Sequence, residues 1–216
     1  MRKLLTIVSS ILFVTTVTAK AEIGMGVTVA AHMFDASGTE TTRQSAEQNS
    51  GSHDETAVVP EIFIEALYDN GATLGISYIP TRDVGSKSRT DTSGATGQES
   101  GTYKAEAELD NVIQVYTDLP VGAVAGYDAY VKLGVQHVTL VTLESLNSGS
   151  TYPNKELFGL TIGAGVKGDL PYGNNMYYKG ELTYTDFETY EGKASGNRVE
   201  ADLEDLAAKF SIGYKF

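Results

Sequence analysis

The stretch LAAKFSIGYKF, residues 206–216, decides the fold of this chain because its side chains alternate strictly between two characters. Apolar or aromatic side chains occupy every second position, namely Leu206, Ala208, Phe210, Ile212, Tyr214 and Phe216. Small or charged side chains lie between them: Ala207, Lys209, Ser211, Gly213 and Lys215. Successive side chains of a β-strand point to opposite faces. The stretch, extended back to residue 204, therefore predicts a strand with one apolar and one polar face.

The same alternation recurs along the chain and dominates over any helical period. It predicts seven further strands, over residues 22–34, 58–70, 72–84, 105–119, 127–143, 157–170 and 176–187. These segments are longer than the ~5–6 residues of a typical globular strand. They are also long enough for the ~9–11 residues with which a tilted strand crosses a bilayer.

The N-terminal segment MRKLLTIVSSILFVTTVTAKA, residues 1–21, has the pattern of a secretory signal peptide. Two cations, Arg2 and Lys3, precede an apolar run, and a small-x-small pattern ends at Ala21. We expect cleavage after residue 21, so that residues 22–216 form the mature protein. An uncleaved N-terminal anchor is the alternative.

Composition excludes several functions. The chain of 216 residues has a formal net charge of −12, which makes it a poor partner for nucleic acid. It contains no cysteine, so neither disulfides nor thiolate metal ligands are available. No cofactor-binding motif and no metal-ligand spacing is present, and we expect neither a cofactor nor a metal.

The expected connections alternate between long and short. Long ones cover residues 35–57, 85–104, 144–156 and 188–203, whereas Asn70-Gly71, 120–126 and 171–175 are short. Such sorting is typical of membrane barrels with short periplasmic turns and long external loops. The predicted fold is all-β, an eight-stranded antiparallel up-and-down transmembrane β-barrel. A soluble sandwich or lipocalin-like barrel also has amphipathic strands, but it leaves the sorted loop lengths unexplained.

The final stretch FSIGYKF resembles the closing strand of bacterial outer-membrane barrels. The predicted mature chain is similar to the small eight-stranded group that includes the OmpA transmembrane domain, OmpX/Ail-type proteins and opacity-like proteins. The resemblance implies the Gram-negative outer membrane, contact with its lipid and lipopolysaccharide, and recognition by the barrel-assembly machinery. It also implies that Tyr214 and Phe216 belong to an assembly signal.

The polar faces of the strands would fill the lumen, because eight strands enclose only enough space for side chains. We expect a charge network there, formed by Glu61, Glu65, Asp110, Lys132, Lys167, Lys179, Glu181 and Lys209. Glu106 and Glu108 share the inward parity of Asp110, and Glu181 is expected to pair with Lys209 on the next strand. A narrow polar conduit is the alternative to a plug.

Signals for catalysis are weak. His137 and Thr139 resemble the His and Ser of barrel-type lipid A deacylases, but the rest of that signature is missing. We therefore expect no enzyme and no catalytic residue. The four long connections are acidic and rich in Gly, Ser and Thr, which is typical of mobile, hydrated surface. The favoured function is a structural or adhesin-like role with a possible extracellular ligand. A passive channel for water or small ions is the alternative, and a lipid A-modifying enzyme is the least supported.

Overall fold

A computed structural model of the chain describes residues 20–41, 48–91, 101–145, 152–171, 173–194 and 197–216. The expected signal peptide falls almost wholly on residues 1–19, which lie outside the described residues. No helix within the described ranges is long and apolar enough to span a membrane.

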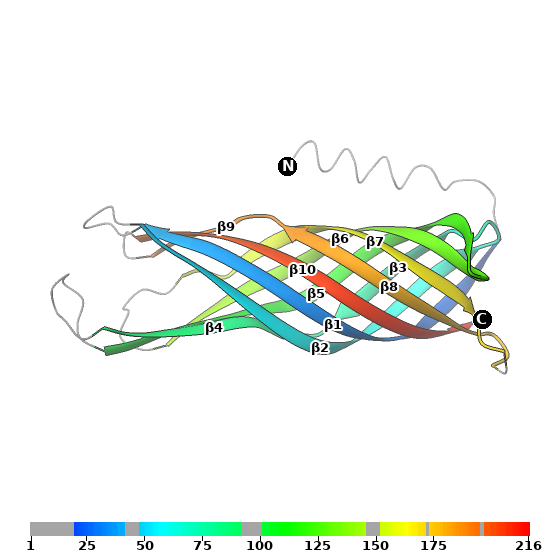
Figure 1. Cartoon of the computed structure of the whole chain (residues 1–216), viewed down its shortest axis with the longest axis horizontal. Coiled ribbons are helices and arrows are strands. Elements are labelled where there is room, and N and C mark those ends of the chain that lie inside the picture. Colours follow the sequence, from blue (N-terminus) through cyan, green and yellow to red (C-terminus); the bar gives the residue numbers. More distant parts are fainter. Residues whose placement is uncertain (1–19, 42–47, 92–100, 146–151, 172, 195–196) are drawn as a thin grey trace.

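Antiparallel β-strands make up nearly all of the described chain. Their bounds are β1 Ala21–Thr41, β2 Gln48–Tyr68, β3 Thr73–Ile79, β4 Arg82–Asp91, β5 Gly101–Val124, β6 Tyr127–Ser145, β7 Lys155–Asp169, β8 Met176–Phe187, β9 Tyr190–Ala194 and β10 Asn197–Lys215. Strand β4 follows β3 and pairs with β5, and β9 follows β8 and pairs with β10. Strand β1 also pairs with β10, which closes a ring of eight strands (Figure 1). The predicted eight-stranded antiparallel closed sheet is confirmed.

The tight turns follow local turn chemistry. Gly71 has a φ of 84° and its N–H donates to the carbonyl of Tyr68 at 2.8 Å. At the β5–β6 hairpin, Ala125 and Gly126 have φ angles of 53° and 86°. Positive φ at both central residues is the hairpin geometry that matches strand twist.

The predicted long connections are wrong in extent, because most of their residues that the structure describes are strand. Strands β1 and β2 remain paired out to Thr41 and Gln48, far beyond the expected limits at residues 34 and 58. The apolar segments of β1 and β2 pair in one register, and the polar segments that adjoin them continue the same ladder. Small apolar side chains such as Ala36, Ala57 and Ala201 pack inward there, against a buried core. The outer segments are therefore folded rather than free loops.

Strand β5 contains an irregularity that reverses its side-chain pattern. The register with β6 shifts between Asp110 and Ile113, and Asn111 lies in the left-handed region with a φ of 53°. Asn tolerates this conformation better than most residues. Leu109 and Val112 are both fully buried, so the parity before the bulge is the opposite of the parity after it.

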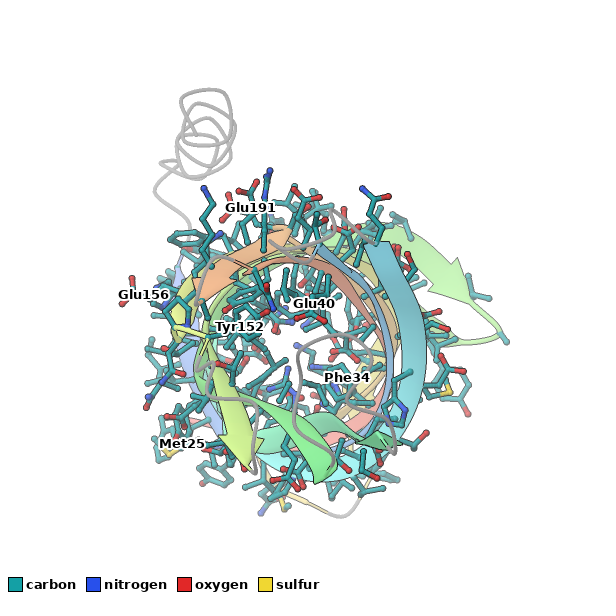
Figure 2. All side chains as sticks on the ribbon, turned by 90° about the vertical axis from the view of Figure 1, so that its left-hand side faces the viewer. Met25, Phe34, Glu40, Tyr152, Glu156 and Glu191 are labelled. Carbon is teal, nitrogen blue, oxygen red and sulfur yellow. The ribbon has the colours of Figure 1, made fainter. Side chains whose placement is uncertain are left out.

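The two faces of the ring differ in chemistry as predicted. Large apolar side chains are exposed on the outer surface, including Val27, Ile64, Val115, Ile162, Leu182 and Phe210. The inner face buries polar and charged side chains. Figure 2, a view along the ring, shows Phe34 and Glu40 inside and Met25 and Glu156 on the outside.

Two prolines interrupt the wall between β2 and the β3–β4 segment. The β2–β3 ladder ends at Ile62 opposite Tyr78. Continuing that register places Pro60 opposite Pro80. Proline has no N–H to donate to a ladder, so pairing stops where the two face each other. Beyond this point β4 pairs with β5 alone.

Candidate functional site

A cluster of paired charges fills the half of the lumen nearer the short turns. The ammonium of Lys179 lies 3.0 Å from Glu65 and 2.7 Å from Asp118. The ammonium of Lys132 lies 2.7 Å from Glu181 and 3.3 Å from Asp118. All five side chains are buried. Buried charges are tolerated when paired and hydrogen-bonded, and this arrangement meets that condition. We call these five residues the lower cluster.

Three tyrosines donate hydrogen bonds to two carboxylates of the lower cluster. The hydroxyl of Tyr116 donates to Glu65 at 2.6 Å, and that of Tyr177 donates to its other oxygen at 2.7 Å. The hydroxyl of Tyr130 donates to Glu181 at 2.8 Å. Glu65 and Glu181 thus each have a cation and at least one phenol, whereas Asp118 is paired with the two lysines. The three carboxylates outnumber the two ammonium groups of the lower cluster by one.

Glycines on the inner face provide space for these rings. A Cβ atom on Gly165 would lie 2.6 Å from the hydroxyl oxygen of Tyr130, and one on Gly75 would overlap the ring of Tyr116. The inward glycines are therefore part of the packing of the plug.

A second cluster lies further along the lumen, and its centre is a residue that we had not placed in the network. His32 is fully buried, with Nδ1 2.8 Å from Asp205 and Nε2 3.3 Å from Glu61. Lys209 reaches Glu61 at 2.7 Å. Arg82 is buried nearby, and within the described residues its guanidinium nitrogens have no hydrogen-bond partner. We call these five residues the upper cluster. The inward parity of His32 and Asp205 was the only signal in the sequence.

The expected pair of Lys209 and Glu181 is not formed. The two residues are directly opposed across β8 and β10, as the expected hairpin requires. Each side chain instead passes over one strand, Lys209 to Glu61 beyond β1 and Glu181 to Lys132 beyond β7. Strand adjacency can be read from a sequence, whereas contacts beyond the adjacent strand depend on closure of the ring.

Hydroxyl and amide groups connect the two clusters. Thr28 and Ser211 share a hydrogen bond of 2.7 Å, Gln114 donates to Thr161 at 3.1 Å, and Gln136 donates to Thr185 at 3.1 Å. A void of about 10 Å³ lies among side chains of this zone and of both clusters. A space of this size holds about one water molecule.

An apolar layer fills the lumen beyond the upper cluster. Phe34 marks the boundary, because its ring stacks on His32 at 5.6 Å and lies 5.3 Å below the guanidinium of Arg82. The layer consists of Phe34, Val59, Ile79, Val84, Leu109, Val112, Val138, Leu140, Leu157, Phe187, Tyr190 and Leu203. The sequence analysis missed this layer, because it assigned several of these positions to loops or to the opposite parity.

The remaining predicted network residues lie apart from both clusters. Lys167 donates to the carbonyl of Gly71 at 2.7 Å, at the short-turn rim. The inward placement of Asp110 is wrong, together with that of Glu106 and Glu108. The β5 bulge reverses their parity, and Asp110 instead accepts a hydrogen bond from Thr81 on the outside.

Tyr214 and Phe216, the proposed assembly residues, lie on the outer surface. Their side chains are 42% and 68% exposed, and their rings meet edge to face at 5.0 Å. The N–H of Phe216 donates to the carbonyl of Ile23 at 2.9 Å, across the closing pair of strands.

His137 also faces outward. Its Nε2 lies 3.6 Å from Glu156, and its ring lies 5.0 Å from that of Phe158. Within the described ranges no group of three or more His, Cys, Asp or Glu side chains could hold a metal ion.

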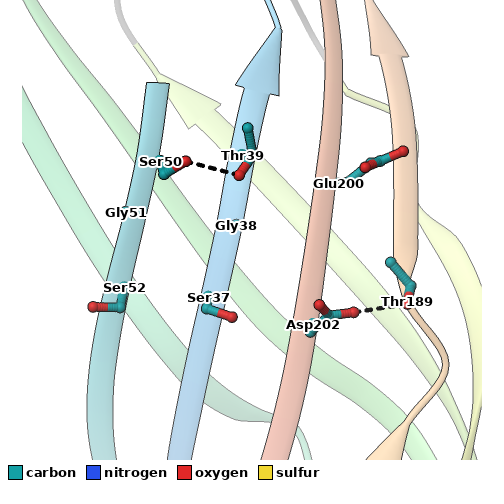
Figure 3. Close-up of a pocket in the computed structure, with 9 residues that line it drawn as sticks. All are labelled: Ser37, Gly38, Thr39, Ser50, Gly51, Ser52, Thr189, Glu200 and Asp202. Atoms are coloured by element: carbon teal, nitrogen blue, oxygen red, sulfur yellow. Dashed lines mark hydrogen bonds between the residues drawn. The ribbon is translucent and has the colours of Figure 1, made fainter. Parts of the chain in front are cut away.

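An open hollow of about 640 Å³ lies on the wall near the long connections (Figure 3). Its lining is mostly Ser, Thr and Gly from β1 and β2, together with Glu200 and Asp202 of β10. Several of these groups already bond to each other, since Thr39 pairs with Ser50 at 2.9 Å and Thr189 donates to Asp202 at 2.7 Å.

A closed antiparallel ring with an apolar outer surface and a charge-filled interior defines the class of membrane-spanning β-sheet proteins. No protein-family model matches the chain, and no curated protein matches it in sequence.

The solved structures that the chain matches include outer-membrane proteins. The outer membrane protease OmpT of Escherichia coli has 10% identity and a TM-score of 0.44, with 94% of this chain and 99% of that chain covered. The outer membrane protein AlkL in lipid bilayers has 11% identity and a TM-score of 0.45, with 94% of each chain covered. Ail of Yersinia pestis, in complex with a heparin analogue, has 11% identity and a TM-score of 0.35, with 86% and 99% covered. At this level of similarity the roles of these proteins are not transferred to the chain.

Proposed function

We propose that this protein is an integral outer-membrane protein with a sealed lumen, which presents the outer segments of its strands as a rigid platform for interaction at the cell surface. We call these segments the outer part: residues 35–41, 48–57, 82–91, 101–110, 139–145, 188–194 and 197–204. The proposal includes export by the signal peptide at residues 1–21.

The observation that carries the proposal is the apolar layer, which gives the outer part a core of its own. Phe34, Val84 and Leu203 pack inside it, while the wall outside is polar. Hydrogen bonds add to this order, since Tyr152 donates to Glu40 at 3.0 Å and Asn197 donates to the same oxygen at 3.1 Å. A folded extension of this kind presents a preformed surface, which favours a role in binding.

The filling of the lumen favours this function over a passive channel. A permeating ion would have to displace the paired charges of the lower cluster and then cross the apolar layer. Both steps are costly, because the buried charges would lose their partners and the layer is apolar. We propose no enzymatic role, because the described chain brings no nucleophile, base and orienting acid together at one place.

The contacts of the protein with lipid and with the assembly machinery follow from its outer surface. The exposed apolar residues match acyl chains, and the acidic outer part lies where lipopolysaccharide headgroups would be. We propose Tyr214 and Phe216 as part of the assembly signal on β10, the strand that closes the ring against β1.

Cysteine labelling on intact cells tests the location and the orientation. The native chain has no cysteine, so a single introduced cysteine is the only thiol that the reagent can label. We expect Ser52→Cys to react with a membrane-impermeant maleimide on intact cells. The matched control Asn174→Cys, in the short β7–β8 turn, should react only after permeabilisation. The reverse order, or recovery of the protein in the soluble fraction, would contradict the proposal.

Shortening the β1–β2 hairpin tests the surface role. A variant in which residues 37–52 are replaced by a two-residue turn removes part of the platform but keeps every predicted membrane-spanning residue. Adherence of cells expressing it to immobilised matrix proteins should fall, while its folding and membrane insertion stay normal. Unchanged adherence would contradict the surface role and favour a purely structural one.

A further inference from the structure

The β5–β6 hairpin extends beyond its neighbouring strands at the short-turn end of the ring. The ladder between β3 and β5 ends at Asp118, so in the described part of the chain β5 pairs with β6 alone from Leu119 to Val124. The ladder between β6 and β7 ends at Asp128. Residues 119–128 are all exposed, on both faces of the hairpin. We call these ten residues the flap.

A bulge bends the flap away from the axis of the ring. The register between β5 and β6 shifts between Pro120 and Gly122, and Gly122 has a φ of 118°, which other residues rarely adopt. An extra residue in one strand kinks that strand. Figure 1 shows the end of β5 bending at the short-turn end, and Figure 2 shows the hairpin, in pale green, standing out from the circumference of the ring. The flap therefore runs outward from the ring.

The direction of this bend decides where each face of the flap points. The alternation along β6 is unbroken, so Tyr127 shares the outer, apolar face of that strand with Leu133. Val124 is opposed to Tyr127 and shares its face, whereas Ala123 is opposed to Asp128 on the other face. When a hairpin at the short-turn end bends outward, its outer face turns toward the membrane. Val124 and Tyr127 therefore face the membrane, and Asp128 faces the water beyond it.

The chemistry of the flap matches the boundary between lipid and water. Its sequence LPVGAVAGYD contains a single charged residue, Asp128, which lies on the face turned toward water. On the membrane face Val124 is 60% exposed, and the ring of Tyr127 meets that of Tyr178 edge to face at 6.4 Å. Tyrosines are enriched at membrane interfaces, because one end of the ring is apolar and the other is wet.

The apolar face of the flap continues a surface that already contacts lipid. Leu119 and Tyr127 lie at its base, and the exposed apolar residues of the outer wall follow them without a polar interruption on β6 up to Leu133. A two-stranded hairpin is only marginally stable in water unless a further surface covers it. The leaflet beside the ring is the surface that this face meets.

We propose that the flap is an interfacial anchor, which lies along the phospholipid leaflet on the short-turn side with Val124 and Tyr127 immersed among headgroups and upper acyl segments. Such an anchor holds the ring at a fixed depth in the membrane. The inference rests on the proposed function for the presence of the membrane, and a control at Ile162 in the wall separates failure of the anchor from failure of that location.

Tryptophan fluorescence of the full chain, refolded into phosphatidylcholine vesicles, tests the anchor. The native chain has no tryptophan, so a single introduced one is the only reporter. Val124→Trp and Tyr127→Trp place it on the membrane face at two positions, either of which suffices if the other does not refold. Ala123→Trp is the matched control on the opposite face. Tryptophan itself prefers interfaces, and comparison of adjacent positions removes that preference from the result.

We expect Val124→Trp and Tyr127→Trp to lose most of their emission in vesicles whose phosphatidylcholine is brominated on the upper acyl segments. Ala123→Trp should keep its emission there and lose it to iodide, an aqueous quencher. Ile162→Trp should be quenched most by lipid that is brominated near the chain ends, because it lies within the apolar wall.

Four outcomes would overturn the inference. Quenching of Val124→Trp and Tyr127→Trp by iodide alone, with Ile162→Trp quenched by lipid, would mean that the flap stands in water. Equal quenching of Ala123→Trp and Val124→Trp by lipid would exclude a flap with one face in water. Shielding of the flap from both quenchers, with a dimeric mass, would make a second copy of this chain the occupant. Absence of lipid quenching at Ile162→Trp would contradict the membrane location itself.

Discussion

At the scale of single residues, the buried lysines show how this lumen tolerates charge. Lys179 lies between two carboxylates and within 5.0 Å of the ring centroid of Tyr116. Lys132 lies even closer to that ring, at 3.6 Å. A cation above an aromatic face gains more when it is desolvated. The rings therefore add attraction that the carboxylates alone do not supply.

The contact between Lys209 and Glu61 gives a stability prediction. Lys209→Ala leaves the buried Glu61 without its ammonium, and we expect a loss of about 3–5 kcal/mol in the free energy of unfolding. Lys209→Ala combined with Glu61→Gln should recover part of this loss in a double-mutant cycle measured by urea unfolding. The matched cycle of Lys209→Ala with Glu181→Gln should be closer to additive. Stronger coupling to Glu181 than to Glu61 would contradict the geometry.

The outer surface gives a second prediction. Leu133 and Ile162 are opposed across β6 and β7 on the apolar face, and Ile162 is 56% exposed. Arginine at Leu133 should lower the free energy of unfolding in lipid vesicles by about 2–4 kcal/mol, because it places a charge among acyl chains. Thr139→Arg, which lies opposite Glu156 beyond the apolar zone, is the control and should cost about 0–1 kcal/mol. Equal effects of the two substitutions would mean that the apolar face does not contact lipid.

At the scale of strands, local irregularities determine the strand pairing as much as the alternation of side chains does. The bulge in β5 allows Leu109 to enter the apolar layer and Asp110 to leave the lumen. The opposed prolines end one ladder, and the positive φ angles of Ala125 and Gly126 turn another. Each irregularity is one or two residues long and changes the course of a whole strand segment.

The bulge can be tested at Asn111. Its φ of 53° is accessible to glycine but costs most other residues roughly 1–2 kcal/mol. Asn111→Gly should therefore change stability little, while Asn111→Val should lower it by at least that amount in urea unfolding. Should Asn111→Val prove neutral, the left-handed conformation would not be needed for the bulge.

The sequence predicted the strands well where alternation was uninterrupted. The inward positions of Lys132, Lys179 and Lys209 follow from parity alone, and so does the direct opposition of Lys209 and Glu181. Parity failed at Asp110 because a bulge inserts a residue, and Asn111 was the single polar interruption that marked it. The outer part was assigned to loops because its Ser, Thr and Gly residues carry no apolar period. The partners across the lumen could not be predicted, since they depend on which strands face each other after closure.

At the scale of the whole molecule, the lumen has two barriers in series. The paired charges occupy the half near the short turns, and the apolar layer occupies the half near the long connections. A polar plug resists an apolar molecule and an apolar layer resists an ion. Such a ring separates its two openings more completely than either barrier would alone.

Conductance in planar bilayers checks this arrangement. We expect the refolded wild-type protein to show no resolvable conductance at neutral pH. Lys132→Ala should also remain silent, although it loosens the lower cluster, because the apolar layer still blocks the path. Discrete conductance steps in the wild type would restore the channel hypothesis, and steps in Lys132→Ala alone would assign the seal to the charges.

Closure of the ring by β1 and β10 has a consequence for how the protein folds. The bond between Thr28 and Ser211 joins residues 183 positions apart, whereas every other pair of neighbouring strands is joined by a short turn or a single connection. Forming a hairpin costs little chain entropy because its loop is short. The contact between β1 and β10 costs more, because it closes nearly the whole chain into one loop. Pairings so distant in sequence slow folding. We therefore expect the meeting of β1 and β10 to come last in folding, and until it occurs each of these two strands offers a bare edge to any other chain nearby.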